Sequence, residues 1–192
     1  MWTIGILLIF SKQVDTVEQA SAIVSYAKYG KSVNGKRSAP PSRFLPGVSD
    51  LCIDPSKTFQ QNLNNQAAIV FQIESLKGIH NLDAILTAVG KDIDSVWLGS
   101  LDARVSMEFK AGGLWGEEAE WKEAVKIYEG TLRKHNFPAS GLALGDPAMA
   151  KGRSFMVTTS DMYSLMGQGM QDLGAMRKNY PAMDYSEVYE PL

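Results

Sequence analysis

Two acidic residues stand where this sequence could carry out chemistry. Glu74 directly follows an apolar run at 67–73 (AAIVFQI), and Asp102 lies three residues past Gly99, after the run SVWL at 95–98. If these runs are neighbouring parallel strands, about 5 Å apart, both acids reach the same edge of a sheet. Carboxylate oxygens with positions left open for water and substrate suit Mg²⁺ or Mn²⁺ better than Zn²⁺. On spacing alone, the alternative is that Glu74 merely precedes a helix and Asp102 caps a turn.

Other candidates for chemistry are weaker. His80 falls in the first turns of one predicted helix and His135 at the end of another, so both are expected to be solvated. The basic residues from Lys31 to Arg43 could meet an anionic substrate, although a solvated loop has the same composition. The glycines at 112–116 lack the strand-then-helix context of a phosphate-binding loop. No nucleophile-elbow serine and no Cys/His pair is present for covalent catalysis.

The elements that must position Glu74 and Asp102 alternate along the chain. Apolar runs predict buried strands, and the 3.6-residue spacing of apolar side chains predicts helices between them. We expect a single domain over 1–192, with a long loop at 30–63 and an irregular tail at 179–192. Five βα units in series favour an α/β fold with a parallel sheet, whose active groups lie at the carboxyl ends of the strands. The predicted strands are 3–10, 67–73, 95–98, 140–144 and 154–158, and the predicted helices are 17–29, a stretch around 79–86, one opening at 117–120 and ending at 135, and 161–178.

Composition narrows the partners and the compartment. A formal net charge of -2 gives no electrostatic reason to expect nucleic acid or an anionic membrane as a partner. The lone Cys52 excludes an intramolecular disulfide, which favours a reducing compartment such as the cytoplasm. The apolar run at 3–10 has no preceding basic residue, so we interpret it as a strand rather than a signal-peptide core.

The residues around both acids are similar to a known family. Gln72-Ile73-Glu74-Ser75, followed by Leu98-Gly99-Ser100-Leu101-Asp102, resembles the paired signature of the HpcH/HpaI aldolase and citrate lyase family. The segment 97–107 resembles, more narrowly, a fungal branch of that family. The resemblance extends to 14–20 (VDTVEQA), to the GKRS loop at 35–38 and to the stretch from Phe155 to Asp161, which together span nearly the whole chain.

The resemblance implies a metal-dependent carbon–carbon lyase on a partial (β/α)8 TIM-type barrel with about five of eight βα units. Glu74 and Asp102 would hold Mg²⁺ or Mn²⁺, which stabilises the enolate of a small 2-oxo acid such as oxaloacetate or pyruvate. Gln72, Ser100, Leu101 and Asp102 would bind the substrate, the carboxylate being received by backbone N–H groups around Leu101 and Asp102.

The sequence also departs from that family. The chain begins at what resembles strand four, and the family's catalytic His and its Arg have no counterpart, so no catalytic residue is identified. The segment ILLIFSKQ at 6–13 is longer than the family's short segment ending in proline. The alternative function is therefore a catalytically incomplete homologue that serves as a binding or assembly subunit. Either way we expect a homo-oligomer, because open sheet edges and exposed core residues promote association.

Overall fold

The architecture is a parallel sheet covered by helices on one face. A computed structural model describes residues 7–38, 54–109, 116–143, 152–157 and 161–179. Residues up to Gly141, together with Gly152–Met156, form one compact unit, and Leu142–Lys151 with Val157–Leu192 form a second. The helices and strands are β1 Leu7–Ser11, α1 Val17–Ala27, η1 Lys31–Val33, α2 Phe59–Asn65, β2 Ala67–Ile73, α3 Leu76–Val89, η3 Gly90–Asp92, β3 Ser95–Leu98, α4 Ser100–Ser106, α5 Ala119–His135, β4 Ala139–Leu142, β5 Arg153–Val157 and α7 Asp161–Asn179.

The strands follow one another across the sheet in chain order, β1-β2-β3-β4-β5. β1 pairs parallel with β2, β2 with β3, and β3 with β4. Parallel neighbours need crossover connections, and α1 and α3 supply the helices of the first two crossovers. The predicted α/β fold with a parallel sheet is thus confirmed, whereas the assignment of 1–192 to one domain stays a prediction.

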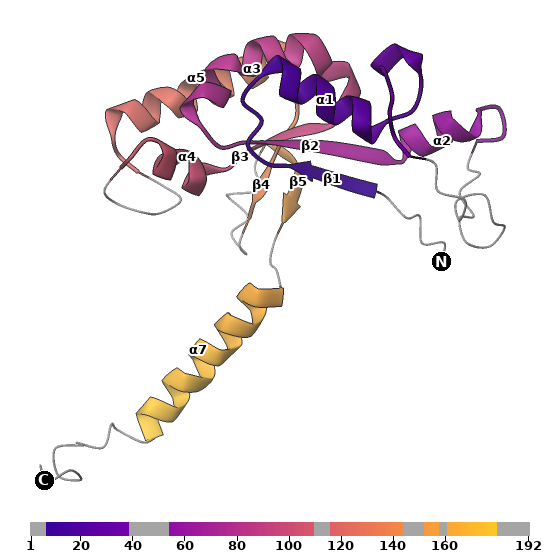
Figure 1. Cartoon of the computed structure of the whole chain (residues 1–192). Coiled ribbons are helices and arrows are strands. Elements are labelled where there is room, and N and C mark those ends of the chain that lie inside the picture. Colours follow the sequence, from indigo (N-terminus) through magenta and orange to yellow (C-terminus); the bar gives the residue numbers. More distant parts are fainter. Residues whose placement is uncertain (1–6, 39–53, 110–115, 144–151, 158–160, 180–192) are drawn as a thin grey trace, which may run out of the picture. The chain divides into compact units, whose positions relative to one another are not determined.

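Helices α1, α3 and α5 lie side by side over one face of the sheet (Figure 1). Alternate side chains of β2 point into the layer between sheet and helices, where Ile69, Phe71 and Ile73 are fully buried. α3 meets them with one apolar face at helical spacing, formed by Ile79, Leu82, Ile85, Leu86 and Val89. The core therefore lies on the helix side of the sheet, and its packing fixes the orientation of β2 and of Glu74 at the end of that strand.

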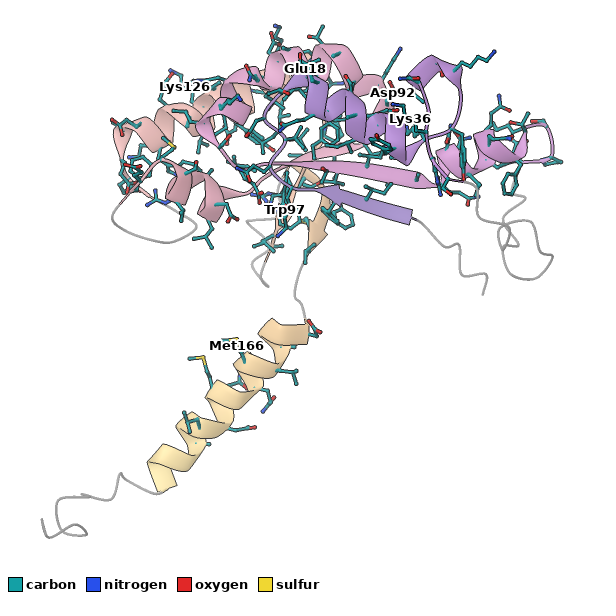
Figure 2. All side chains as sticks on the ribbon, viewed as in Figure 1. Glu18, Lys36, Asp92, Trp97, Lys126 and Met166 are labelled. Carbon is teal, nitrogen blue, oxygen red and sulfur yellow. The ribbon has the colours of Figure 1, made fainter. Side chains whose placement is uncertain are left out.

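The opposite face of the sheet carries aromatic side chains. Val96 belongs to the helix-side core, so its neighbour Trp97 lies on the other face, as Figure 2 shows. The ring of Phe10 on β1 contacts Trp97 edge-on at a centroid distance of 5.8 Å, and it contacts Phe155 on β5 at 5.9 Å. Phe10 stays 39% exposed. We call this aromatic side the inner face, because it is the side turned away from the helices.

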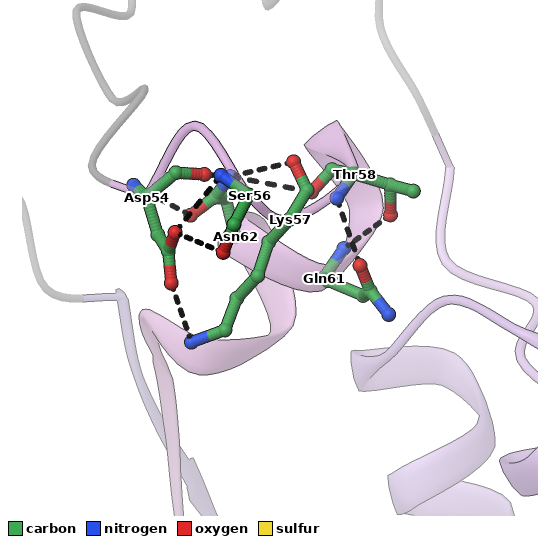
Figure 3. A network of polar contacts seen from close by, with 6 residues as sticks. All are labelled: Asp54, Ser56, Lys57, Thr58, Gln61 and Asn62. Atoms are coloured by element: carbon green, nitrogen blue, oxygen red, sulfur yellow. Dashed lines mark hydrogen bonds and ion pairs between the residues drawn. The ribbon is translucent and has the colours of Figure 1, made fainter.

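The predicted loop at 30–63 contains regular structure. The turn η1 lies at its start, and helix α2 begins near its end. Thr58 and Gln61 form a capping box at the start of α2, while Asp54 accepts hydrogen bonds from the backbone and hydroxyl of Ser56 and pairs with Lys57 at 3.0 Å (Figure 3). α2 has only seven residues, too few for apolar periodicity to reveal it.

The other predicted elements agree with the structure to within a few residues. β1 ends at Ser11, one residue later than predicted, and α1 ends at Ala27. Thr16 caps α1 with a capping box to Gln19, as its position before an apolar helix predicts. Asp161 opens α7. The start of the first predicted strand, residues 39–53 of the long loop with Cys52 among them, the glycines at 112 and 113 and the tail from 180 lie outside the described residues.

Candidate active site

Glu74 lies at the carboxyl end of β2, where the chain turns toward α3. Its side chain is buried, with 7% of the residue exposed. Ser75 next to it caps α3 by accepting a hydrogen bond from the Gly78 N–H at 2.9 Å, and its hydroxyl donates to the Asp15 carboxylate at 2.5 Å. β2 holds the backbone before Glu74, and the Ser75 cap with its bond to Asp15 holds the backbone after it. The direction of the Glu74 side chain is therefore fixed.

Gly99 makes room for that carboxylate. A Cβ atom at this position would lie 2.5 Å from Cγ and 2.7 Å from Oε1 of Glu74, closer than real contacts allow. The Gly99 N–H donates to the Ile73 carbonyl at 2.9 Å, which ties the end of β3 to the end of β2. A residue with a side chain would fit there only if the Glu74 side chain moved away. The Glu74 side chain thus lies directly against the turn that follows β3.

Asp102 stands in the first turn of α4, which corrects its predicted place on a loop. Gly99 is the N-cap of α4, and its carbonyl accepts the Ala103 N–H at 2.9 Å. The helix has seven residues, too few to be recognised by periodicity. Asp102 therefore lies on a helix instead of a loop, but it still follows the carboxyl end of β3, because α4 begins directly after that strand. Asp102 itself is exposed.

The structure brings the two carboxylates together, as the spacing predicted. Burial raises the pKa of Glu74, and the negative charge of Asp102 and a hydrogen bond between the two side chains raise it further. The positive charge of Lys12 and the backbone N–H of Gln13 act in the opposite direction and lower this pKa. Two acids in contact, one of them buried, form a site where a proton or a cation is favourable.

A buried ion pair holds the helix that carries Asp102. The Arg104 guanidinium, with its side chain 2% exposed, donates to both oxygens of Glu118 at 2.6 and 2.9 Å. The same guanidinium lies 5.3 Å from the ring centre of Phe109 and 5.6 Å from that of Trp121. Glu118 is the N-cap residue of α5. This pair therefore fastens α4 to the start of α5, one of the helices that cover the sheet.

The predicted substrate-binding residues lie on the same elements as the two acids, at the end of β2 and the start of α4. Gln72 is half-buried and is the register partner of Trp97, so it lies on the inner face. Ser100 and Leu101 open α4 beside Asp102, half-buried and 43% exposed respectively. The substrate-binding role that the family resemblance implies for these residues stays a prediction.

Neither histidine joins this group. His80 is exposed on α3, and the His135 imidazole pairs with Asp83 at 2.7 Å beside Lys134. Within the described ranges, no group of three or more His, Cys, Asp or Glu residues could hold a metal ion. Sequence reasoning assigned no role to Lys12, Arg104 and Glu118, because no local pattern marks them. It named Gly99 only as the end of a strand and as part of the family signature.

In α/β-barrel enzymes the active sites lie at the carboxyl ends of the parallel strands, which is where Glu74 and Asp102 lie in this sheet. The sequence profile of the HpcH/HpaI aldolase/citrate lyase family matches residues 3–123. The chain belongs to this family.

Two similar relatives share one name. The chain is 28% identical over 155 residues to the 2-keto-3-deoxy-L-rhamnonate aldolase of Klebsiella pneumoniae subsp. pneumoniae, and 30% identical over 155 residues to that of Salmonella paratyphi B. Each match covers 77% of this chain and 51% of the relative. The chain thus spans about half the length of these relatives.

Solved structures share the fold. Macrophomate synthase superposes with a TM-score of 0.69 at 23% identity, over 91% of this chain and 60% of that one. An HpcH/HpaI aldolase from Desulfitobacterium hafniense superposes with a TM-score of 0.68 at 18% identity, over 88% and 63%. The predicted partial barrel is confirmed, because each superposition covers most of this chain but less than two thirds of the neighbouring structure.

Proposed function

We propose that this chain is a metal-dependent carbon–carbon lyase that acts on a small 2-oxo acid such as oxaloacetate or pyruvate. The observation that carries the proposal is the contact between Glu74 and Asp102 at the carboxyl ends of adjacent strands. The names of the relatives, which are aldolases, support the same reaction class.

The donor chemistry fits Mg²⁺ or Mn²⁺. Both cations prefer carboxylate oxygens and keep several positions for water and substrate. The raised pKa of Glu74 marks an unfavourable negative charge, which a bound cation would offset. When bound, a divalent cation supplies Lewis-acid stabilisation of negative charge that develops on substrate oxygens.

The chain's own residues bind and orient the acid. Backbone N–H groups at Leu101 and Asp102 open α4 and receive the substrate carboxylate, while Ser100 lies beside them. Gln72 offers an amide from the inner face of β2. These donors keep the acid in one orientation against Glu74 and Asp102, which is the positioning part of catalysis.

A binding experiment tests the metal site directly. Free Mn²⁺ is measured by electron paramagnetic resonance as it is titrated into the purified chain, and Mg²⁺ is then used to displace it. Glu74→Gln and Asp102→Asn should each weaken binding by at least about tenfold, because each removes one of two charged ligands. Equal affinities for the wild type and both variants would refute the site. Pyruvate release from 2-oxo acids in the presence of Mg²⁺ tests the reaction.

A second function is favoured by the position of the histidines. Neither lies with Glu74 and Asp102, so among the described residues no imidazole is placed to serve as a general base. The chain would then be a homo-oligomeric binding or assembly subunit that takes up the acid without turning it over. Binding of Mn²⁺ and 2-oxo acid without release of product would establish this role.

The proposal includes a cytoplasmic location and no nucleic-acid partner. The net charge of -2 favours neither a polyanion nor an anionic membrane surface. Within the residues that the structure describes, no helix combines the length and the apolar composition needed to cross a membrane.

A further inference from the structure

Asp15 occupies the same position in the first βα unit as Glu74 in the second. The sequence QVDT at 13–16 follows β1, and the similar sequence QIES at 72–75 begins at the end of β2. In each segment a fully buried aliphatic residue precedes the acid, and the hydroxyl residue after the acid is the N-cap of the next helix. The carboxylate of Glu74 meets Asp102, whereas the carboxylate of Asp15 has a different partner.

The Asp15 carboxylate lies at the first turn of α3. It accepts a hydrogen bond from the Ser75 hydroxyl at 2.5 Å, and a Cβ atom on Gly78 would lie 3.0 Å from its Oδ1. The same Ser75 oxygen accepts the Gly78 N–H at 2.9 Å. Because the hydroxyl hydrogen is directed at Asp15, the lone pairs of this oxygen are left to accept that N–H. Asp15 therefore fixes the orientation of Ser75, the residue that directly follows Glu74.

The backbone of Asp15 is held by three other elements. Its N–H donates to the Gln19 side chain on α1 at 2.8 Å, and its carbonyl accepts a hydrogen bond from the Asn81 side chain on α3 at 2.7 Å. The preceding Val14 N–H donates to the Gln72 carbonyl on β2 at 3.1 Å. The carboxylate thus projects from a backbone whose position does not depend on the hydroxyl that it binds.

We propose that Asp15 is a positioning residue for the cation site and acts on Glu74 through the hydroxyl of Ser75. This inference rests on the function proposed above, because Glu74 is one of the two proposed metal ligands. Residues that orient a ligand without touching the metal determine how tightly a site binds it. The rival role is a negative charge at the start of α3 that stabilises the helix and leaves Glu74 unaffected.

Two substitutions of Asp15 separate these roles, since both remove the charge and only one removes the acceptor. Asp15→Asn keeps an oxygen within reach of the Ser75 hydroxyl, and Asp15→Ala does not. Mn²⁺ is titrated into the full chain and free Mn²⁺ is measured by electron paramagnetic resonance. The affinity should stay within about twofold of the wild type in Asp15→Asn and fall about tenfold in Asp15→Ala. Equal losses in the two variants, or wild-type affinity in Asp15→Ala, would overturn the inference and leave the proposed lyase site standing.

Removing the hydroxyl tests the same link from its other end. Ser75→Gly deletes the hydroxyl and keeps a residue that is suited to an N-cap. It should reproduce the loss of Mn²⁺ affinity, and Asp15→Ala should add little to it in that background. Unchanged affinity in Ser75→Gly, or a full additional loss in the double variant, would show that Asp15 does not act through Ser75.

A helix cap elsewhere in the chain is the matched control. Thr58 caps α2 through a capping box, so Thr58→Ala should lower the urea midpoint of unfolding. It should leave Mn²⁺ affinity unchanged, because α2 precedes β2 and carries neither proposed ligand. A loss of Mn²⁺ affinity in Thr58→Ala equal to that in Asp15→Ala would reduce the role of Asp15 to general stability and overturn the inference. A wild type that binds no Mn²⁺ would overturn both the metal site and this inference.

Discussion

Arg104 and Glu118 form a bidentate ion pair across 14 residues of sequence, in which Nη1 and Nη2 of Arg104 each donate to a separate carboxylate oxygen of Glu118. Arg104 lies two positions after Asp102 on the short helix α4, and Glu118 caps α5. α5 is anchored in the core by Trp121, Ala124, Tyr128 and Leu132. The pair therefore connects the candidate metal ligand Asp102 to a helix that packs in the core.

Breaking this pair should loosen α4 and weaken cation binding without removing a ligand. Glu118→Gln leaves the buried guanidinium without its charged partner, and Arg104→Met removes the charge itself. Each variant should lower the thermal unfolding midpoint by about 5 °C or more and weaken Mn²⁺ binding several-fold. Thermal unfolding followed by circular dichroism and the Mn²⁺ titration measure the two effects.

An exposed pair on α5 is the matched control for this prediction. Arg133 pairs with Glu129 at 3.4 Å, and its side chain is 69% exposed. Arg133→Met should change the midpoint and the Mn²⁺ affinity very little, because exposed pairs contribute little. Wild-type Mn²⁺ affinity in both Arg104→Met and Glu118→Gln would show that α4 needs no such anchor.

Gly99→Ala should displace the Glu74 carboxylate. The added methyl group would overlap Cγ of Glu74 at 2.5 Å, and the side chain must turn away from Asp102 to relieve the overlap. We expect Mn²⁺ affinity to fall by about tenfold, close to the effect of losing the ligand. The control is Gly130→Ala on α5, where a Cβ meets open space and where alanine should stabilise the helix by about 1 kcal/mol. Identical Mn²⁺ affinities in these two variants would contradict the close contact.

The pH dependence of cation binding should report the raised pKa of Glu74. Burial and the charge of Asp102 favour the protonated form, so protons compete with the cation at a higher pH than for an ordinary carboxyl group. Mn²⁺ affinity should fall by about tenfold per pH unit once the pH drops below that pKa. Asp102→Asn removes the charge that raises it, so the residual binding of that variant should persist to lower pH. Superimposable profiles would contradict the coupling of the two acids.

The same pKa predicts how stability changes with pH. The folded state holds the Glu74 proton more tightly than the unfolded state, so its ionisation on raising the pH reduces the free energy of unfolding. Without metal, Glu74→Gln should therefore be more stable than the wild type above the raised pKa. The difference should disappear in acid, below the pKa of Glu74 in the unfolded chain. Urea unfolding across roughly pH 4 to 8 measures it, and a variant less stable than the wild type at neutral pH would refute the sign.

The sequence predicted the strands and the long helices, and it missed the short helices and the individual tertiary contacts. Apolar runs and apolar periodicity predict buried strands such as 67–73 and long helices such as α5. The order of these elements implied that Glu74 and Asp102 lie at the same edge of the sheet. The seven-residue helices α2 and α4 are too short for such a signal. The approach of Lys12 to Glu74 and the pairing of Arg104 with Glu118 depend on tertiary packing, to which no local pattern corresponds.

Self-association should follow from the edge of the sheet at β1. β1 is the first strand in the order, and no described strand pairs with its outer side. Its Phe10 is 39% exposed beside Trp97 and Phe155, so an aromatic surface adjoins an open row of backbone donors and acceptors. Such edges promote pairing between chains, and charged side chains suppress it. Light scattering over a dilution series should therefore give a mass above that of one chain, and Phe10→Lys should shift the population toward the monomer. Tyr26→Lys is the matched control, because Tyr26 is 65% exposed and belongs to α1 rather than to β1. A single monomeric mass at every concentration, or equal effects of the two lysine variants, would show that the β1 edge does not drive assembly.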